Sequence, residues 1–331
     1  MPTEPRAREG STVHPGGGAS TTAPVLGAVV AGALMATQSR MNGEMSRITG
    51  QPIQTALYSF GSGLLVLTVL VLVLPSVRRG VADIGRAWRD GSLAVRHSLG
   101  GLIGALFVAV QAFAVPVIGV ALFTVASIAG QTGNALAVDR LGIAGAPRRP
   151  VHLSRVLAAG LALAGVAVAM APRIGGELAL VPVLLAILVG GGQAVQQATN
   201  VKVNAASRRL IATTWLNFLT GTALLALLAL GAWALGDLAW TSLAGVPWWA
   251  FLGGLLGIGF IAIAAWAVNQ LGVFTYTLPM LTGFLGTAVL LDLLHPQARE
   301  SVTPLVLLGV VITFASAVLA AMLARPRRRP A

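Results

Sequence analysis

Long apolar runs recur along the chain and are separated by short polar segments. An α-helix needs roughly 20 apolar residues to cross the hydrocarbon core of a bilayer, and these runs are near that length. The pattern predicts an all-α integral membrane fold. Its ten transmembrane helices are expected at residues 24–42, 53–75, 98–115, 117–138, 154–172, 180–201, 211–235, 248–269, 271–293 and 302–324. Very short turns around Pro116 and Asn269 are expected to join the third helix to the fourth and the eighth to the ninth.

The second half of the chain repeats a pattern of the first. The run from Gly100 to Gly104 is followed by Asp139, and the run from Gly253 to Gly257 is followed at the same distance by Asp292, so that the offset is 153 (253 − 100). Internal repeats are a recurring feature of secondary transporters, which bind their solutes at the repeat interface. We therefore expect a first five-helix repeat over residues 23–173 and a second over residues 177–324.

The basic residues indicate the orientation of these helices. With the N-terminus in the cytoplasm, the expected cytoplasmic segments hold 18 of the 22 basic residues, and the outer segments hold Arg40, Arg47, Arg173 and Arg299. Basic residues accumulate on the cytoplasmic side of membrane proteins. Both termini are therefore predicted to be cytoplasmic. Because five is an odd number, the two repeats are predicted to be inverted with respect to each other.

Composition supports a membrane protein and excludes several kinds of chemistry. Of the 331 residues, 56% are hydrophobic and 10% are charged, whereas soluble domains carry about 25% charged residues. The net charge of +12 comes from arginines that flank apolar runs, so no nucleic-acid partner is expected. The chain has no cysteine, and its four histidines lack metal-ligand spacing. We therefore expect no metal, no cofactor and no enzymatic activity.

The two ends of the chain differ from the apolar body. Residues 1–22 are rich in glycine, proline, serine and threonine, which is typical of a disordered leader. Residues 325–331 hold four arginines and are expected to form a basic cytoplasmic tail after the last helix.

Several short motifs resemble those of a known family. They are Asn42, Gly50-x-Pro52, Ser59-Phe60-x-x-Gly63, the Gly100–Gly104 run, Gly119, Gly130-Gln131 and Asp139 in the first half, and Asn204, Asn217-Phe218-x-x-Gly221, the Gly253–Gly257 run, Gly272 and Asp292 in the second. With these motifs the chain resembles the drug/metabolite transporter superfamily, in particular its YdcZ-like branch, in a double-length form with ten helices. The resemblance implies a transporter of the bacterial inner membrane and covers about residues 24–324. It implies no particular substrate, because members with this architecture move very different solutes.

Polar side chains inside the predicted helices mark an expected solute pathway, because each costs free energy in a bilayer unless it is paired or faces water. The first and sixth helices end with the same order of amide, base and amide at an offset of 162 (200 − 38). A site lined by amides and aromatic rings suits a polar solute. The pathway is predicted to be lined by Gln38, Asn42, Gln111, Gln131, Gln193, Gln196, Asn200, Asn204, Asn217, Trp266 and Asn269. Alternatively, the amides at the helix ends cap the last helical turns.

Four charged residues are candidates for ion coupling or for ion pairing: Arg40, Lys202, Asp139 and Asp292. The two bases lie at helix ends, from which long basic side chains often reach the membrane interface. The two aspartates also lie near helix ends. Either each pairs with a neighbouring arginine, such as Arg140 or Arg299, or one of them couples transport to protons. The repeated glycines Gly100, Gly104, Gly253 and Gly257 have the spacing of close helix packing.

The sequence therefore predicts a secondary transporter that moves a small polar organic solute by alternating access. Its two repeats are expected to rock around a cavity lined by the first, third, sixth and eighth helices. Proton coupling and export are both compatible with the sequence. A passive channel remains an alternative, because its pore would use the same amides. A non-transporting scaffold or sensor subunit is a second alternative, but the predicted loops leave no large soluble domain. The expected partners are the solute and the lipid bilayer, and the sequence permits a homodimer.

Overall fold

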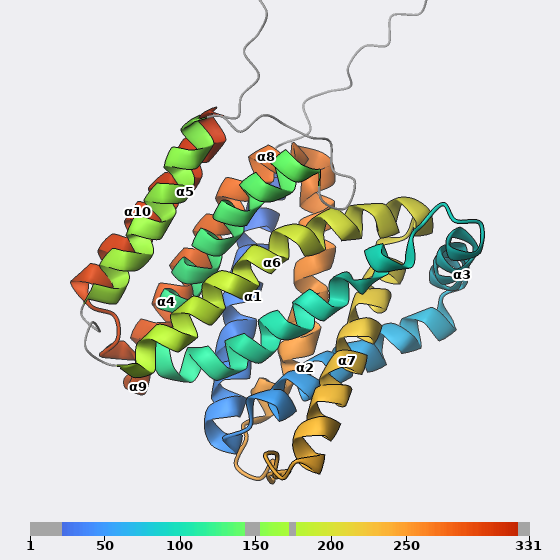
Figure 1. Cartoon of the computed structure of the whole chain (residues 1–331), viewed down its shortest axis with the longest axis horizontal. Coiled ribbons are helices and arrows are strands. Elements are labelled where there is room, and N and C mark those ends of the chain that lie inside the picture. Colours follow the sequence, from blue (N-terminus) through green and yellow to red (C-terminus); the bar gives the residue numbers. More distant parts are fainter. Residues whose placement is uncertain (1–21, 143–152, 172–176, 324–331) are drawn as a thin grey trace, which may run out of the picture.

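The computed structural model describes residues 22–142, 153–171 and 177–323, and the regular structure within these ranges is helical (Figure 1). The first half contains α1 (Thr22–Thr49), α2 (Pro52–Val73), α3 (Pro75–Arg89), a short 3₁₀ helix η1 (Val95–Leu99), α4 (Gly100–Leu141) and α5 (Leu153–Met170). The second half contains α6 (Glu177–Ser207), α7 (Leu210–Ala234), a 3₁₀ helix η4 (Trp248–Leu252), α8 (Gly253–Leu294), α9 (Pro296–Arg299) and α10 (Pro304–Leu323).

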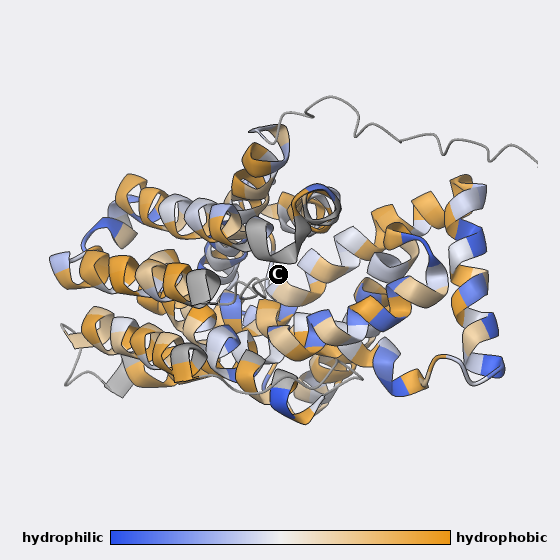
Figure 2. Cartoon of the chain, turned by 90° about the horizontal axis from the view of Figure 1, so that it is seen from above, coloured by the Kyte–Doolittle hydropathy of each residue, from blue (hydrophilic) through white to orange (hydrophobic). Residues whose placement is uncertain are grey.

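Apolar side chains dominate the long helices (Figure 2). Among the described residues, five helical stretches are long and apolar enough to cross a membrane, at 22–49, 52–73, 95–138, 180–207 and 210–234. Four shorter apolar helices follow the same trend, at 156–170, 248–264, 278–294 and 304–319. The fold is therefore that of a multi-pass membrane protein. The number of ten crossings and the side on which the termini lie stay predictions.

The two longest helices are bent elements rather than straight rods. In α4 the helix breaks at Gly119, whose φ of 79° and ψ of 165° are not helical. The break therefore lies three residues after Pro116, where the turn between the third and fourth helices was expected. In α8 both ends lie beside the same part of α1. Gly253 faces Asn42, and His295 Nε2 lies 3.7 Å from a Glu44 carboxylate oxygen. Each bent helix covers the residues of two predicted crossings.

The two repeats exchange helices. α1 packs along α8 of the second repeat, and α6 packs along α4 of the first repeat. The contacts are reciprocal, since Gly283 abuts the main chain at Val29 and Gly130 abuts the main chain at Ile187. These pairs are related by offsets of 158 (187 − 29) and 153 (283 − 130). A pseudo-two-fold axis therefore relates the two halves of the molecule.

Equivalent helices meet at this axis. The rings of Phe60 on α2 and Phe218 on α7 lie 4.9 Å apart, and Gly63 and Gly221 make room for them. On the other side of the molecule α5 packs against α10, where a Cβ on Gly165 would lie 2.9 Å from the carbonyl oxygen of Gly309. Because glycine has no side chain, the helix backbones approach closely at these contacts.

Two differences from the sequence predictions concern helix ends, and a third is an additional helix. α1 continues to Thr49 instead of ending at residue 42, and α6 continues to Ser207 instead of residue 201. The charges near the end of α1 are compatible with a helix because they pair at helical spacing, with Glu44 contacting both Arg40 and Arg47. The segment after α2, which was expected to be a loop, forms the amphipathic helix α3.

Candidate functional site

Three buried side chains of the first repeat form a closed amide cluster: Ser39, Asn42 and Gln111. Asn42 Nδ2 donates to Gln111 Oε1 at 2.8 Å, and Gln111 Nε2 donates to Ser39 Oγ at 2.6 Å. None of the three is more than 1% exposed. Each lies in a helix, and the loss of one partner would leave a buried polar atom unpaired at a cost of about 1–3 kcal/mol.

Three side chains of the second repeat form an open amide cluster: Gln196, Asn200 and Asn217. Asn217 Nδ2 donates to Asn200 Oδ1 at 2.9 Å, and Gln196 Nε2 donates to Asn217 Oδ1 at 3.3 Å. Asn217 is 7% exposed, whereas Gln196 and Asn200 are only half-buried. The open cluster therefore keeps hydrogen-bonding capacity that is accessible to another molecule.

Glycines of the opposite bent helix face both clusters. A Cβ on Gly253 would lie 2.6 Å from Asn42 Oδ1, and a Cβ on Gly100 would lie 3.1 Å from Asn200 Oδ1. One turn further along, Gly257 faces Gln38 and Gly104 faces Gln196, at 2.9 and 2.7 Å from their Nε2 atoms. These four glycines were expected to serve helix packing. In the structure amide side chains of the facing helix lie where the glycines have no side chain.

The reciprocal contacts correct the alignment of the two polar helices. They relate α1 to α6 at an offset of 158, so that Asn42 corresponds to Asn200 and Gln38 to Gln196. The pairing at an offset of 162 is wrong by about one helical turn of 3.6 residues. The sequence-based pairing took the wrong register, because amides recur about one helical turn apart on both α1 and α6. At the correct offset Lys202 corresponds to Glu44, an acid, and not to Arg40.

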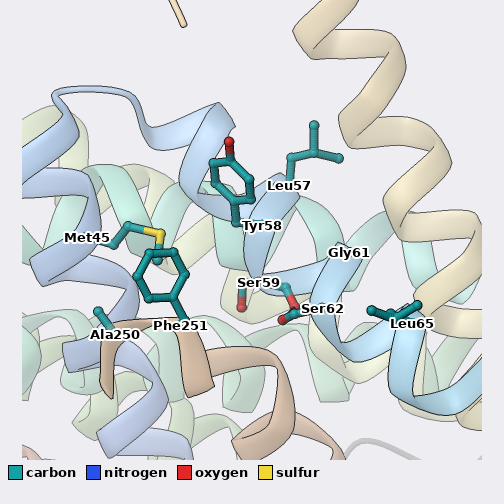
Figure 3. Close-up of a pocket in the computed structure, with 9 residues that line it drawn as sticks. All are labelled: Met45, Leu57, Tyr58, Ser59, Gly61, Ser62, Leu65, Ala250 and Phe251. Carbon is teal, nitrogen blue, oxygen red and sulfur yellow. Dashed lines mark hydrogen bonds between the residues drawn. The ribbon is translucent and has the colours of Figure 1, made fainter. Parts of the chain in front are cut away.

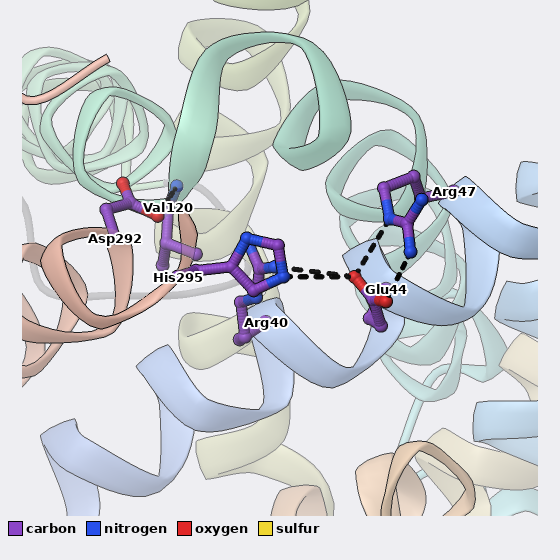
Figure 4. A network of polar contacts seen from close by, with 6 residues as sticks. All are labelled: Arg40, Glu44, Arg47, Val120, Asp292 and His295. Atoms are coloured by element: carbon purple, nitrogen blue, oxygen red, sulfur yellow. Dashed lines mark hydrogen bonds and ion pairs between the residues drawn. The ribbon is translucent and has the colours of Figure 1, made fainter. Parts of the chain in front are cut away.

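A cluster of charged side chains lies at the end of α1 (Figure 4). The Glu44 carboxylate contacts Arg47 at 2.7 Å and Arg40 at 3.3 Å, and His295 lies 3.7 Å away. Burial, together with the nearby Arg40, lowers the pKa of His295 below its ordinary value. A pocket of about 60 Å³ opens among these side chains and Ser301, with room for about two water molecules.

Asp292 belongs to the same region but has main-chain partners. Its carboxylate is fully buried and accepts hydrogen bonds from the backbone N–H groups of Val120 at 3.0 Å and Ala121 at 2.7 Å. These residues begin the second leg of α4, just after the break at Gly119. Helix N-termini carry unpaired N–H groups and partial positive charge, which a carboxylate satisfies. Asp292 therefore caps a helix of the opposite repeat.

An apolar groove of about 250 Å³ lies between α1, α2 and η4 (Figure 3). The large apolar side chains Met45, Leu57, Leu65 and Phe251 are among the residues that line it. Ser59 also lines the groove, and its buried hydroxyl has no hydrogen-bond partner among the residues that the structure describes. The groove is poorly suited to a polar solute, because few polar groups converge on it.

A known protein family matches the chain twice. The family described as "Putative inner membrane exporter, YdcZ" matches residues 23–168 and again residues 181–319. The chain belongs to the YdcZ family. Its two matches correspond to the two halves that exchange helices in the fold, so this YdcZ protein is a double-length form, as predicted from the repeated motifs.

The other comparisons support the fold alone. A solved crystal structure is similar to this YdcZ protein over 92% of the chain and 98% of its own length, with a TM-score of 0.53 and 20% sequence identity. No curated protein matches the chain significantly. Family membership makes the chain a multi-pass inner-membrane protein of a transporter family, and the transported solute is a matter for proposal.

Six of the predicted pathway residues lie in or beside the two amide clusters, and the others lie elsewhere. Asn42 and Gln111 lie in the closed cluster, Gln196, Asn200 and Asn217 form the open cluster, and Gln38 faces Gly257. Gln131 and Gln193 are half-buried, Asn204 and Lys202 are exposed, and Trp266 is 45% exposed. The side chains of Asn269 and Asp139 lie outside the described residues.

Sequence reasoning missed part of the polar network. Ser39, Glu44, Arg47 and His295 were not among the predicted site residues, although all four make polar contacts in the structure. A signal existed for two of them, because Glu44 lies four residues after Arg40 and three before Arg47. Among the described residues, no group of three histidine, aspartate or glutamate side chains has metal-binding geometry.

Proposed function

We propose that this YdcZ protein is a secondary transporter that moves a small, polar, uncharged organic solute across the inner membrane by alternating access. The observation that carries the proposal is the difference between the two amide clusters. They share one pair of positions related by the pseudo-two-fold axis, and of that pair Asn42 in the closed cluster is 1% exposed whereas Asn200 in the open cluster is half-buried. Transporters built from inverted repeats bind their solutes where the repeats meet, and expose the site to one side at a time.

The chemistry of the open cluster supports the choice of solute. Gln196, Asn200 and Asn217 offer amide donors and acceptors and carry no formal charge. Amides hydrogen-bond hydroxyl, carbonyl and amide groups of a neutral solute without requiring a counter-ion. The charged cluster around Glu44 is already paired internally, and its pocket of about 60 Å³ is too small for an organic solute.

The proposal also covers the membrane topology, the direction of transport and its coupling to protons. We favour a topology of ten helices with both termini in the cytoplasm, because the expected cytoplasmic segments hold 18 of the 22 basic residues. The family description favours export. The two backbone hydrogen bonds to Asp292 favour a structural role for this carboxylate, which leaves Asp139 as the aspartate candidate for proton coupling.

Transport into proteoliposomes tests this proposal. The purified chain is reconstituted around an interior pH dye and challenged with a panel of neutral, cationic and anionic metabolites, with radiolabelled counterflow for each neutral solute. We expect saturable counterflow of a neutral polar solute. Asn200→Ala should raise its KM by up to about tenfold, which corresponds to the loss of one hydrogen bond of about 0.5–1.5 kcal/mol.

Asn42→Ala is the matched control in the closed cluster. It removes the same amide from the pseudo-equivalent position, and it should lower the melting temperature while changing KM less than Asn200→Ala. Non-saturable flux without counterflow would identify a passive channel instead of a carrier. A wild-type KM in Asn200→Ala would remove the open cluster from the solute site. A proton flux that persists in the Asp139→Asn/Asp292→Asn double variant would exclude both aspartates as coupling groups.

A further inference from the structure

The helix α3 interrupts the symmetry of the molecule. It lies at the edge of the fold beyond α6 and α7 (Figure 1). Its buried residues Val77, Ile84 and Ala87 pack against Val203 of α6 and Leu216 of α7. The corresponding segment after α7, residues 235–247, forms no long helix and contains no lysine or arginine. A feature present in only one repeat is not needed to build the shared fold.

The outer side of α3 is strongly basic. Arg78, Arg79 and Arg89 are exposed, and their guanidinium groups hydrogen-bond only main-chain carbonyls among the described residues. Arg86 is different, because it pairs with Asp83. Exposed arginines of two neighbouring segments extend this surface. We define the basic face as Arg78, Arg79, Arg89, Arg96, Arg208 and Arg209.

Direct contact joins α3 to the turn between α6 and α7. A Cβ on Gly80 would lie 2.8 Å from Cβ of Arg209, so α3 rests on the base of that side chain. Gly80 is on the buried side of α3, and Arg209 as a whole residue is exposed. The basic face therefore includes arginines of two directly contacting elements, α3 and the turn between α6 and α7, that are distant in sequence.

Arg208 has a backbone conformation that an arginine rarely adopts. Its φ is 52°, in the left-handed region, and the pseudo-equivalent turn of the first repeat has Gly50 with a φ of 67° at the same place, at an offset of 158 (208 − 50). Glycine adopts this conformation freely, whereas a residue with a Cβ is strained. Strained residues persist where the side chain has a function. The second repeat thus carries a charge at a position where the fold itself favours glycine.

The surroundings of the basic face place it at the edge of a bilayer. α3 begins directly after the apolar helix α2, whose last residues Leu72 and Val73 are 68% and 66% exposed. Such exposed apolar residues at the end of a membrane-spanning helix contact lipid chains. Trp88 of α3 is 37% exposed, and tryptophan is enriched at the level of lipid headgroups. In Figure 2 the hydrophilic turns of α3 lie at the right edge of the molecule, beside apolar helices.

We propose that the basic face binds the headgroups of anionic phospholipids. In the described part of the chain its arginines form no ion pair, and guanidinium groups bind phosphate in bidentate geometry. Juxtamembrane basic residues contribute about 1 kcal/mol each to binding an anionic lipid surface, which corresponds to about fivefold per arginine. The apolar side of α3 is already covered by α6 and α7, so the helix presents charge to the headgroups without inserting into the membrane.

Competitive lipid binding tests this inference independently of transport. The full chain in a neutral detergent is exposed to equal amounts of phosphatidylglycerol and phosphatidylcholine, and bound lipids are counted by native mass spectrometry. We expect the wild type to prefer phosphatidylglycerol, the preference to fall about fivefold in Arg208→Gln, and to be lost in Arg78→Gln/Arg79→Gln/Arg89→Gln. Arg299→Gln, an exposed arginine outside the basic face, is the matched control and should behave like the wild type.

Arg208→Gly separates binding from folding. It relieves the strained backbone and removes the charge, so that the melting temperature should rise while the preference for phosphatidylglycerol falls. An equal affinity of the wild type for both lipids, or an unchanged preference in Arg208→Gly and in the triple variant, would overturn the proposal. If inorganic phosphate displaces phosphatidylglycerol at millimolar concentrations, the face is a site for soluble anions and the assignment to lipid is wrong.

Discussion

At the scale of single residues, Gly119 decides the shape of α4. Its φ of 79° and ψ of 165° lie in a region that is essentially restricted to glycine, and a Cβ there would lie 2.8 Å from the buried carboxylate of Asp292. Two effects therefore act against any side chain at this position. One is backbone strain, and the other is displacement of the carboxylate that caps the second leg of α4.

We expect Gly119→Ala to lower the free energy of unfolding by about 1–3 kcal/mol from backbone strain alone. Thermal unfolding in neutral detergent measures the effect as a lower melting temperature. Gly160→Ala in α5 is the control, because a Cβ at Gly160 meets no atom within 4 Å and alanine favours a helix. A wild-type melting temperature of Gly119→Ala would contradict the positive φ described for Gly119.

At the scale of elements, the contact between α2 and α7 joins the two repeats at the pseudo-two-fold axis. Phe60 and Phe218 stack with an interplanar angle of 31° over the glycines of the facing helix. We expect a coupling energy of about 0.5–1.5 kcal/mol in a double-mutant cycle of Phe60→Leu and Phe218→Leu. The cycle is measured by thermal or denaturant unfolding. Phe60→Leu combined with Phe123→Leu is the matched cycle without a ring contact between the two residues, and it should be additive.

The elements also differ in how well the sequence predicts them. The termini of α2 and α7 lie within two residues of the predicted boundaries, because Pro52 and Arg209 border uniform apolar runs. The prediction missed α3, although Val77, Val81 and Ile84 recur at helical spacing. Its polar outer side resembles a loop when composition is considered alone. A period of 3.6 residues in a charged segment is the signal that would have found it.

The sequence predicted which amide residues belong to the candidate site, but not which of them contact one another. The sequence identified the amides, because polar side chains stand out in apolar helices. It did not predict that Asn42 reaches Gln111, a residue 69 positions away, or that Asp292 caps the break at Gly119. Both contacts depend on how bent helices pack, and no local pattern specifies that geometry.

At the scale of the whole molecule, the largest helix contacts lie between the repeats and not within them. α1 has its most extensive contacts with α8, and α6 with α4. A single repeat would therefore expose the faces that its partner covers. We expect residues 1–173 and 177–331, expressed as two separate chains in the same cell, to assemble into a complex that purifies through a tag on either one.

The matched control is the same pair of chains with Gly283→Leu. A side chain at position 283 collides with the main chain at Val29, so the complex should fail to form. Each half expressed alone is expected to be degraded. Stable halves that do not bind each other would contradict the exchange of helices.

This exchange also determines which parts can move as rigid bodies. For the proposed alternating access we expect α1 to move with α8 and α6 with α4, because these pairs have the most extensive contacts. Each body would then contain helices from both halves of the chain, and the hinge between them would not be the linker between the repeats. The hydrogen bonds from Val120 and Ala121 to Asp292 then connect one body to the other. Hydrogen bonds to a charged group contribute about 1.5–3 kcal/mol each. Separating the proposed bodies at this face would break them, so we expect the Asp292 carboxylate to act as a latch that contributes to the barrier of alternating access.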